Sequence, residues 1–277
     1  MTTIPEIIPD RKITYRSHPG YMARENAGQT RATIIGHDGC YGSRWFHGPM
    51  CFERFTSDEE PTITKDGQWR LVVWQTLKRM DRPAGWWRGT PGMSIGMTGY
   101  APVPQSGDYL AQWTPHARRH LSRWKKSKWI IREITFDEYV EGYSRSDQDI
   151  ILRSLFNSLL KLRITTHPGL VRIYGAAPSA TARIEAGFVS TDVPETGESL
   201  HTFSFLCPAG RDVAAGTGLM DHWFAVAQAR GVSWLDFGIF WRKGDPKSWK
   251  GFSRFKSQFG TRFLEYPTPL MRFVSGK

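Results

Sequence analysis

The stretch Trp249-Lys250-Gly251-Phe252-Ser253-Arg254-Phe255-Lys256-Ser257-Gln258-Phe259-Gly260 sets one lysine, Lys256, between aromatic rings in a segment dense with cations. Just upstream, Gly231-Val232-Ser233-Trp234-Leu235-Asp236-Phe237-Gly238 has the pattern of a buried strand that follows a helix. A helix, a buried strand and a basic aromatic segment in this order predict a site built at a strand end. The same spacing of Lys, Arg and Phe is also typical of an amphipathic surface helix, so the pattern alone leaves both interpretations open.

The composition limits the class of protein. The chain has 277 residues, enough for two domains or one large one. It contains 37 Lys and Arg against 26 Asp and Glu, a formal net charge of +11, so we expect it to attract polyanions such as nucleic acids, nucleotides or anionic lipids. Its three cysteines, Cys40, Cys51 and Cys207, are odd in number and widely spaced, which favours reduced thiols over a disulfide framework.

No targeting or metal-binding pattern stands out. The first residues lack the basic and apolar regions of a signal peptide, and no apolar run approaches the ~18 residues of a membrane span, so we expect a cytoplasmic protein. His37, Cys40, His47 and Cys51 invite a zinc interpretation, but no second ligand pair stands at the required spacing. We expect neither a metal nor a cofactor.

Short β-branched and aromatic runs bounded by turn residues predict strands. They are residues 33–35, 71–74, 128–134, 170–174, 183–189, 200–206 and 231–238. A glycine-bearing segment after Cys207 leads into a helix that Gly231 ends. Strands alternating with helices predict an α/β fold. Residues 85–104 are rich in Gly, Pro and aromatic residues and predict an extended connection.

Residues 116–129 form the most basic segment. Thr114 suits an N-cap and Pro115 a first helical turn, so we expect a helix here. Its cations alternate with Leu and Trp, a pattern that fits either a solvated helix face or a surface that follows a phosphate backbone. The cations assigned to such a surface are Arg118, Arg119, Arg123 and Lys125.

Two further helices follow from local signals. Thr135 and Glu138 have the spacing of a capping box, which predicts a helix start. Another helix is expected to open at Ser146, with one apolar stripe that we interpret as core. The stripe consists of Ile151, Leu155, Leu159 and Leu162.

These features together resemble the Fem-type aminoacyl transferases, a branch of the GNAT acyltransferase superfamily. Those proteins carry a helix, a strand with an Asp-Phe-Gly-like end and then a Phe-Lys pair before Phe-Gly, as Asp236-Phe237-Gly238 and Phe255-Lys256 before Phe259-Gly260 do here. The resemblance covers about residues 86–277. It implies two GNAT-like α/β domains packed side by side, one formed by residues 1–140 and 262–277 and the other by 141–261, with the last strand returning to the first domain.

The resemblance also implies an activity. Fem-type enzymes move an activated amino acid from aminoacyl-tRNA onto an amine, in a cell-wall peptide precursor or, in shorter relatives, a peptidyl-nucleoside antibiotic intermediate. By the same resemblance Lys256 is the catalytic cation that stabilises the oxyanion, and Phe255 stacks on the terminal adenine of the tRNA. The charge of five further residues suits tRNA phosphates, although a solvated surface explains each equally well; they are Arg242, Lys243, Lys247, Lys250 and Arg254.

Three alternatives stay open. Asp236 serves either as a base for the attacking amine or as a strand-end group that caps a turn. An ordinary GNAT enzyme would use acyl-CoA and hold its pyrophosphate at a glycine turn, but the gap from Arg211 to the glycines is too long and Asp212 would repel that anion. A non-catalytic RNA-binding module would use the same basic faces without transferring anything.

Overall fold

The computed structural model describes residues 33–37, 40–47, 50–63, 67–76, 79–89, 96–147 and 150–275. It divides into two compact units. Unit 1 comprises Met1–Gly99, Ile239–Ser253 and Arg262–Lys277, and unit 2 comprises Tyr100–Gly238 and Arg254–Thr261. The boundary expected at residue 140 therefore differs from the observed one, because residues 100–140 group with unit 2 and residues 239–253 with unit 1.

Unit 1 is built on a six-stranded sheet in the order β1-β2-β3-β4-β13-β5. The strands are β1 (Thr33–His37), β2 (Cys40–His47), β3 (Met50–Thr56), β4 (Arg70–Gln75), β5 (Trp87–Arg88) and β13 (Leu270–Val274). Antiparallel pairing of β13 with β4 brings the end of the chain back to its first part, as predicted. Trp74, Val72 and Trp86 form the centre of its apolar cluster. The unit also holds strand β12 (Arg262–Glu265).

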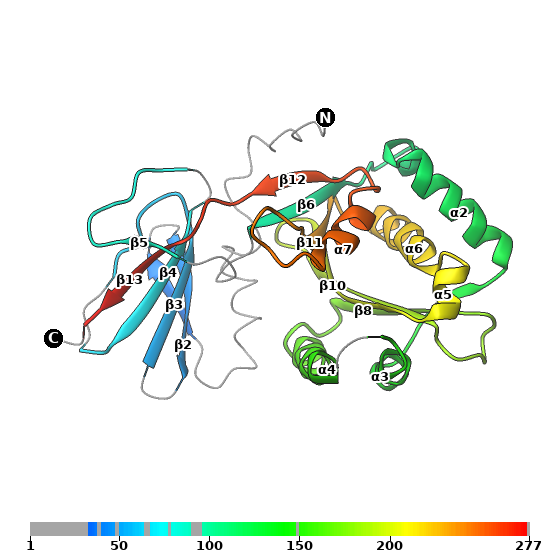
Figure 1. Cartoon of the computed structure of the whole chain (residues 1–277), viewed down its shortest axis with the longest axis horizontal. Helices are drawn as coiled ribbons and strands as arrows, with labels where there is room; N and C mark the ends of the chain where they lie inside the picture. Colours follow the sequence, from blue (N-terminus) through cyan, green and yellow to red (C-terminus); the bar gives the residue numbers. More distant parts are fainter. Residues whose placement is uncertain are drawn as a thin grey trace. The chain divides into compact units, whose positions relative to one another are not determined.

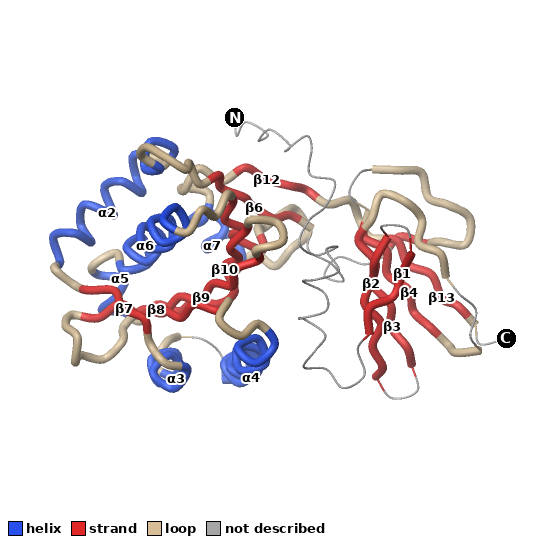
Figure 2. Tube along the Cα trace, turned by 180° about the vertical axis from the view of Figure 1, so that it is seen from behind, coloured by secondary structure: helices blue, strands red, loops and turns tan. Residues whose placement is uncertain are grey.

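Unit 2 is a sheet covered by helices on both faces, as the ribbon and tube views show (Figures 1 and 2). Its strands run in the order β6-β11-β10-β9-β8-β7. They are β6 (Met97–Pro102, whose first half lies in unit 1), β7 (Ile130–Glu133), β8 (Val171–Ala177), β9 (Ala186–Val193), β10 (Glu198–Leu206) and β11 (Trp234–Ile239). Helices α3 (Phe136–Ser144) and α4 (Ile150–Thr166) cover one face, and α5 (Pro208–Asp212) and α6 (Ala215–Ala229) cover the other.

Two of the helix starts predicted from local signals, those of α2 and α3, are confirmed. Helix α2 (Pro115–Ser127) has Thr114 as its N-cap, whose side chain accepts a hydrogen bond from the Ala117 N–H, and it packs against α6. Helix α3 begins with a complete capping box formed by Thr135 and Glu138. These side chains satisfy N–H groups that a helix leaves unpaired at its start, so their signal does not depend on tertiary contacts.

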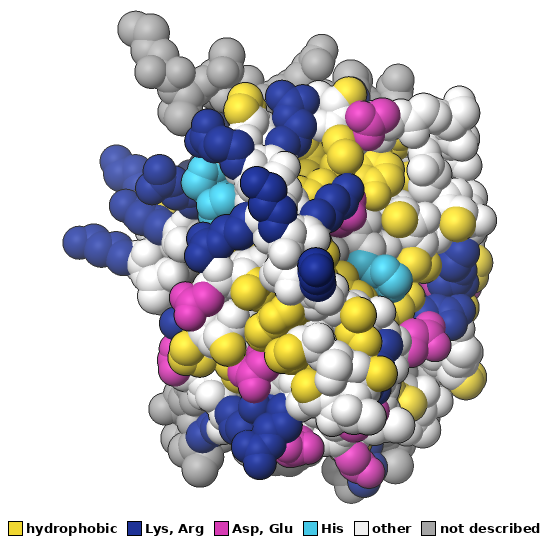
Figure 3. Space-filling view, turned by 90° about the vertical axis from the view of Figure 1, so that its right-hand side faces the viewer, with side chains coloured by type: hydrophobic (Ala, Val, Ile, Leu, Met, Phe, Trp, Pro, Cys, Tyr) yellow, Lys and Arg dark blue, Asp and Glu magenta, His cyan; other side chains and the backbone are white. Residues whose placement is uncertain are grey.

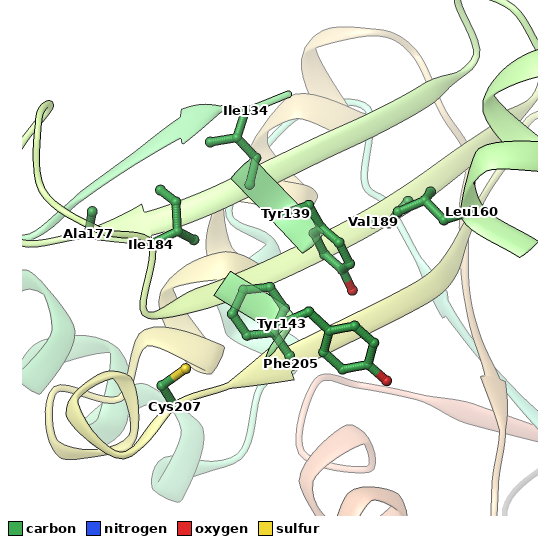
Figure 4. Close-up of a cluster of buried hydrophobic side chains, with 9 residues drawn as sticks. All are labelled: Ile134, Tyr139, Tyr143, Leu160, Ala177, Ile184, Val189, Phe205 and Cys207. Carbon is green, nitrogen blue, oxygen red and sulfur yellow. The ribbon is translucent and has the colours of Figure 1, made fainter. Parts of the chain in front are cut away.

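Aromatic packing joins α3 to the sheet. Figure 4 shows Tyr139 and Tyr143 beside Phe205 of β10, within a cluster of buried side chains. The Tyr143 ring stacks on Phe205 at 5.7 Å between centroids, and Tyr139 meets it edge-on at 5.1 Å. Burial raises the pKa of Tyr139 well above its ordinary value, so this hydroxyl stays neutral. Rings of this size contribute much of the buried apolar area on this face.

One residue of the predicted apolar stripe of α4, Leu159, lies outside the core, and the side chains of Ile151 and Leu155 fall outside the described residues. Leu159 is 41% exposed, whereas its neighbour Leu160 is fully buried in the cluster of Figure 4. Phe156 and Ile164 pack against the same cluster, so the core row follows i, i+4 spacing through Leu160. The described part of this helix begins at Ile150, and residues 148–149 before it lie outside the described residues.

Glycine allows the close approach of α2 and α6. An added Cβ on Gly218 of α6 would lie 2.3 Å from the Trp124 ring of α2, a distance that forces something to move. An added Cβ on Gly216, in the same helix, would come within 3.5 Å of the Phe255 ring, which is ordinary contact. The two glycines therefore differ in packing while sharing one helix.

We expect Gly218→Ala to lower the free energy of unfolding and Gly216→Ala to leave it unchanged or raise it. Alanine gains about 1 kcal/mol over glycine in a helix, but overpacking costs about 1–3 kcal/mol and exceeds that gain at Gly218. Urea unfolding midpoints of the two variants measure the difference. Equal midpoints would show that Trp124 shifts without cost.

Candidate active site around Lys256

Lys256 contacts β11 (Trp234–Ile239) near the carboxyl end of the strand. It is the last residue of α7 (Trp249–Lys256), and its Nζ donates a 2.6 Å hydrogen bond to the carbonyl oxygen of Phe237. Both residues belong to unit 2. The lysine is partly buried rather than fully solvated. The basic aromatic segment and the strand end at Asp236-Phe237-Gly238 therefore meet in one place.

The chain beyond α7 is anchored by a buried ring. Phe259 is fully buried, stacks on Phe237 at 5.9 Å between ring centroids and meets Trp113 edge-on at 4.8 Å. The Thr114 N–H donates a 2.9 Å hydrogen bond to the carbonyl of Gln258. This anchoring fixes Lys256 against the strand end and leaves its amine little freedom to turn away.

Asp236 lies within β11 and bonds the backbone of the same strand. Its carboxylate is 1% exposed, and Oδ1 accepts a 2.6 Å hydrogen bond from the N–H of Gly238. Gly238 has φ = 70°, a backbone conformation that favours glycine. This contact spans Phe237, so the Asp236 side chain is tied to the backbone on the far side of the residue whose carbonyl accepts from Lys256.

The surroundings alter the charge of Lys256. Burial lowers the pKa of its amine from 10.5 to about 8, while the negative charge of Asp236 opposes that fall. The amine therefore remains mostly protonated at pH 7 but loses its proton near pH 8. The protonated amine can stabilise a nearby negative charge. Its hydrogen bond to the Phe237 carbonyl offsets the free energy that burying the ammonium group costs.

His201 belongs to the same cluster, although no sequence pattern assigned it a role. Burial lowers the pKa of its imidazole well below the usual value and the Lys256 charge lowers it further, while a hydrogen bond with the Phe237 carbonyl opposes both. The ring also stacks on Phe188 at 5.2 Å. It is therefore neutral at physiological pH. Its only sequence signal was a lone histidine inside a predicted strand, which is not specific for function.

These groups lie where two parallel strands stop pairing. The register of β10 with β11 covers three positions and ends at Leu200 opposite Asp236, although β10 continues to Leu206. The register of β10 with β9 shifts at the same level, between His201 and Phe203. In α/β sheets, ligands bind outside the carboxyl ends of such strands.

The residues predicted to contact tRNA fall into both units. In unit 2, the Phe255 ring packs edge-on against Phe259 at 5.0 Å and lies near the start of α6. Five exposed cations accompany it: Arg254 of α7 and Arg118, Arg119, Arg123 and Lys125 of α2. Figure 3 shows Lys and Arg side chains gathered at one side of the face that it draws, with His side chains next to them. On α2 the rings of His116 and His120 lie 4.2 Å apart.

The other candidates belong to unit 1. Lys243 and Lys247 are exposed, and Lys250 places its Nζ 4.3 Å above the Trp241 ring. Arg242 is half-buried and donates from its guanidinium to the carbonyl of Tyr266. These four basic residues therefore have different surroundings, which the sequence pattern does not distinguish.

Neither a metal cluster nor a membrane span occurs among the described residues. No group of three or more His, Cys, Asp or Glu side chains is placed to hold a metal ion there. Of the helices in these ranges, none combines the length and the apolar character that crossing a membrane requires.

Comparison with known proteins shows the fold. No family model matches the sequence, and no curated protein does. Among solved structures, FemX is similar with a TM-score of 0.66 at 10% identity, covering 95% of this chain and 96% of that one. The C-terminal domain of a putative lysylphosphatidylglycerol synthetase from Agrobacterium fabrum has a TM-score of 0.52 at 10% identity, covering 91% of this chain and 90% of that one. L-PGS from Bacillus licheniformis also has a TM-score of 0.52 at 10% identity, with coverages of 93% and 92%. The chain thus shares its fold with FemX and with these two structures, as the resemblance to Fem-type proteins implied.

We expect the Lys256 amine to titrate near pH 8 and the Asp236→Asn variant to titrate at lower pH, because Asp236 is the charge that holds this pKa up. The Cε resonance of Lys256, followed by NMR across pH 6 to 11, measures both midpoints. Asp221→Asn is the control, since Asp221 accepts a hydrogen bond from Tyr109 and is not among the charges that act on Lys256. A midpoint near 10.5, or one that Asp236→Asn leaves in place, would contradict the expected electrostatics.

Proposed function

We propose that this protein is an aminoacyltransferase that moves an amino acid from aminoacyl-tRNA onto an amine. The observation that carries the proposal is the Lys256 ammonium, hydrogen-bonded to the Phe237 carbonyl at the end of β11. The fold shared with FemX supports it, as do two further structures named for lysylphosphatidylglycerol synthesis. Aminoacyl-tRNA as the donor implies a cytoplasmic reaction.

The chemistry needs little from the protein beyond orientation and charge. The ester of an aminoacyl-tRNA is already activated, so a neutral amine attacks its carbonyl carbon directly and a tetrahedral oxyanion forms. The carbon–nitrogen bond forms, the ester carbon–oxygen bond breaks, and the ribose oxygen leaves with the proton that the nitrogen loses. No covalent enzyme intermediate, metal or cofactor enters this sequence.

Lys256 is assigned to the oxyanion. An ammonium offers three donors, and one of them serves the Phe237 carbonyl. The carbonyl contact orients the amine, while Asp236 helps to keep it charged. A neutral His201 adds no second positive charge that would drive the lysine proton off. Asp236 acts on the reaction through Lys256, because its buried carboxylate already accepts a hydrogen bond from the Gly238 N–H.

The donor is assigned to the aromatic and basic groups of unit 2. Phe255 would stack on the terminal adenine, and the exposed cations of α2 would contact backbone phosphates. The acceptor is assigned by resemblance to a small peptide, either linked to a nucleoside or part of a cell-wall precursor.

Two other functions predict different results. An acyl-CoA-dependent enzyme needs an anion-binding turn, but Arg211 lies in α5 and its guanidinium bonds Asp147 at 2.5 Å. A non-catalytic RNA-binding module would bind tRNA whether or not Lys256 is present. Acetyl transfer from acetyl-CoA, or RNA binding without transfer from any charged tRNA, would replace the proposed activity.

We expect Lys256→Ala to reduce transfer from a pool of radiolabelled aminoacyl-tRNAs to peptide acceptors by about 10²–10³-fold, the usual effect of removing one oxyanion donor. The far-ultraviolet circular dichroism of the variant should match that of the parent. Lys161→Ala is the control, because Lys161 is an exposed lysine of α4 in the same unit. Full turnover by Lys256→Ala would remove this amine from the mechanism.

We expect the double variant Arg119→Gln, Arg123→Gln to weaken tRNA binding and to flatten its dependence on salt. Removing one cation that neutralises a phosphate lowers the slope of log affinity against log salt by roughly 0.7–0.9. Filter binding at several salt concentrations measures the slope, with Lys161→Gln as the matched removal of a surface charge. An unchanged slope would mean that α2 is only a solvated face.

A further inference from the structure

Unit 1 contains a cavity of about 700 Å³ whose lining is rich in arginine. Four of its lining residues are arginines, Arg79, Arg82, Arg88 and Arg242, and Glu265 is the only carboxylate among the described residues that line it. All of them belong to unit 1, and none contributes to the Lys256 cluster. The volume lies in the range of small-molecule sites in proteins.

Arg242 is held in this cavity by its neighbours. Its guanidinium donates from Nη1 to the carbonyl of Tyr266 at 3.3 Å, and its backbone N–H donates to Oδ2 of Asp245 at 2.8 Å. The guanidinium lies so close to Gly96 that an added Cβ there would stand 2.2 Å from its Cζ. The Tyr266 N–H in turn donates to the Gly96 carbonyl at 2.9 Å. The missing side chain of Gly96 therefore leaves the room that the Arg242 guanidinium occupies.

Other parts of the lining are joined to the sheet of unit 1 by backbone pairing and by hydrogen bonds. Arg88 lies in β5, opposite Leu270 of β13. The side-chain amide of Gln75 donates to the carbonyls of Thr76 and Pro267, at 3.1 and 2.8 Å, and so joins the end of β4 to the segment before β13. The backbones of Arg88 and Arg242 are thus tied to neighbouring segments, and the bond to the Tyr266 carbonyl also orients the Arg242 guanidinium before any ligand arrives.

The charges of the lining favour an anion. The four arginines and the one glutamate leave a net formal charge of three positive. Within the described part of the chain, none of the four arginines forms an ion pair with a carboxylate. Like charges gathered at one concave wall raise the local potential and attract counter-charge. An arginine guanidinium binds two oxygens of one phosphate or carboxylate group at a time. A ligand with a single acidic group therefore cannot contact several of these arginines in this way.

We propose that this cavity binds a compact polyanion, a small molecule that carries two or more adjacent phosphate or carboxylate groups. Arg242, whose charge in the sequence suggested a tRNA phosphate contact, serves this site. The cavity dimensions suit a small ligand rather than a nucleic acid chain. The site is independent of the transfer chemistry assigned to Lys256, and its test measures binding alone.

The test is isothermal titration calorimetry of the full chain with inorganic pyrophosphate and, separately, with citrate. At least one of them should bind, and the pair distinguishes phosphate from carboxylate recognition. Arg88→Gln and Arg242→Gln should each weaken that binding by about tenfold or more, because each removes a charge-assisted contact. Arg262→Gln, an exposed arginine of unit 1 outside the lining, should change the affinity less than about twofold.

Two results would overturn the proposal. One is the absence of binding by both anions at low ionic strength. The other is equal affinity in Arg88→Gln, Arg242→Gln and Arg262→Gln. Circular dichroism shows whether Arg242→Gln folds. If it does not, Arg88→Gln still tests the proposal, because it replaces an exposed side chain. Transfer by the Lys256 site plays no part in either result, so the two proposals stand or fall separately.

Discussion

The Phe237 carbonyl oxygen is the acceptor on which the candidate active site depends. It receives the Lys256 ammonium at 2.6 Å and also contacts His201, so one backbone atom joins α7, β11 and β10. A partly dehydrated ammonium is costly unless a hydrogen bond compensates it. The carbonyl can serve because the parallel register of β10 and β11 ends at Asp236, one residue before it. The acceptor therefore lies just beyond the last paired position of the two parallel strands.

Elements with local signals could be predicted from the sequence. The N-cap Thr114 and the capping box of Thr135 satisfy backbone groups within one turn, so a few residues specify them. Strand β11 could be predicted because a short, largely apolar run precedes Gly238, although the strand continues through that glycine to Ile239. The order of these elements was enough to indicate the Fem-type fold, although no family model matches the chain.

Features decided by tertiary contacts could not be predicted. Strand β6 lies in a segment whose Gly and Pro content favoured a loop, yet Tyr100 and Ala101 within it are fully buried. The apolar row of α4 passes through Leu160 because the sheet selects that face, and the sequence offered Leu159 equally well. His201 lies next to a shift in the register between β9 and β10, and no local sequence pattern predicts such a shift.

The basic aromatic segment shows why charge spacing alone does not identify a catalytic lysine. Lys243 and Lys247 are exposed, Lys250 lies over an indole ring, and Lys256 alone of these four is partly buried against a carbonyl. Only burial changes the chemistry of the amine, because desolvation moves its pKa to about 8 while solvated ammonium groups keep their hydration. What selects Lys256 is Phe259, three residues further on, whose ring fills the space between Trp113 and Phe237. An apolar residue therefore decides which cation in this segment is placed for electrostatic work.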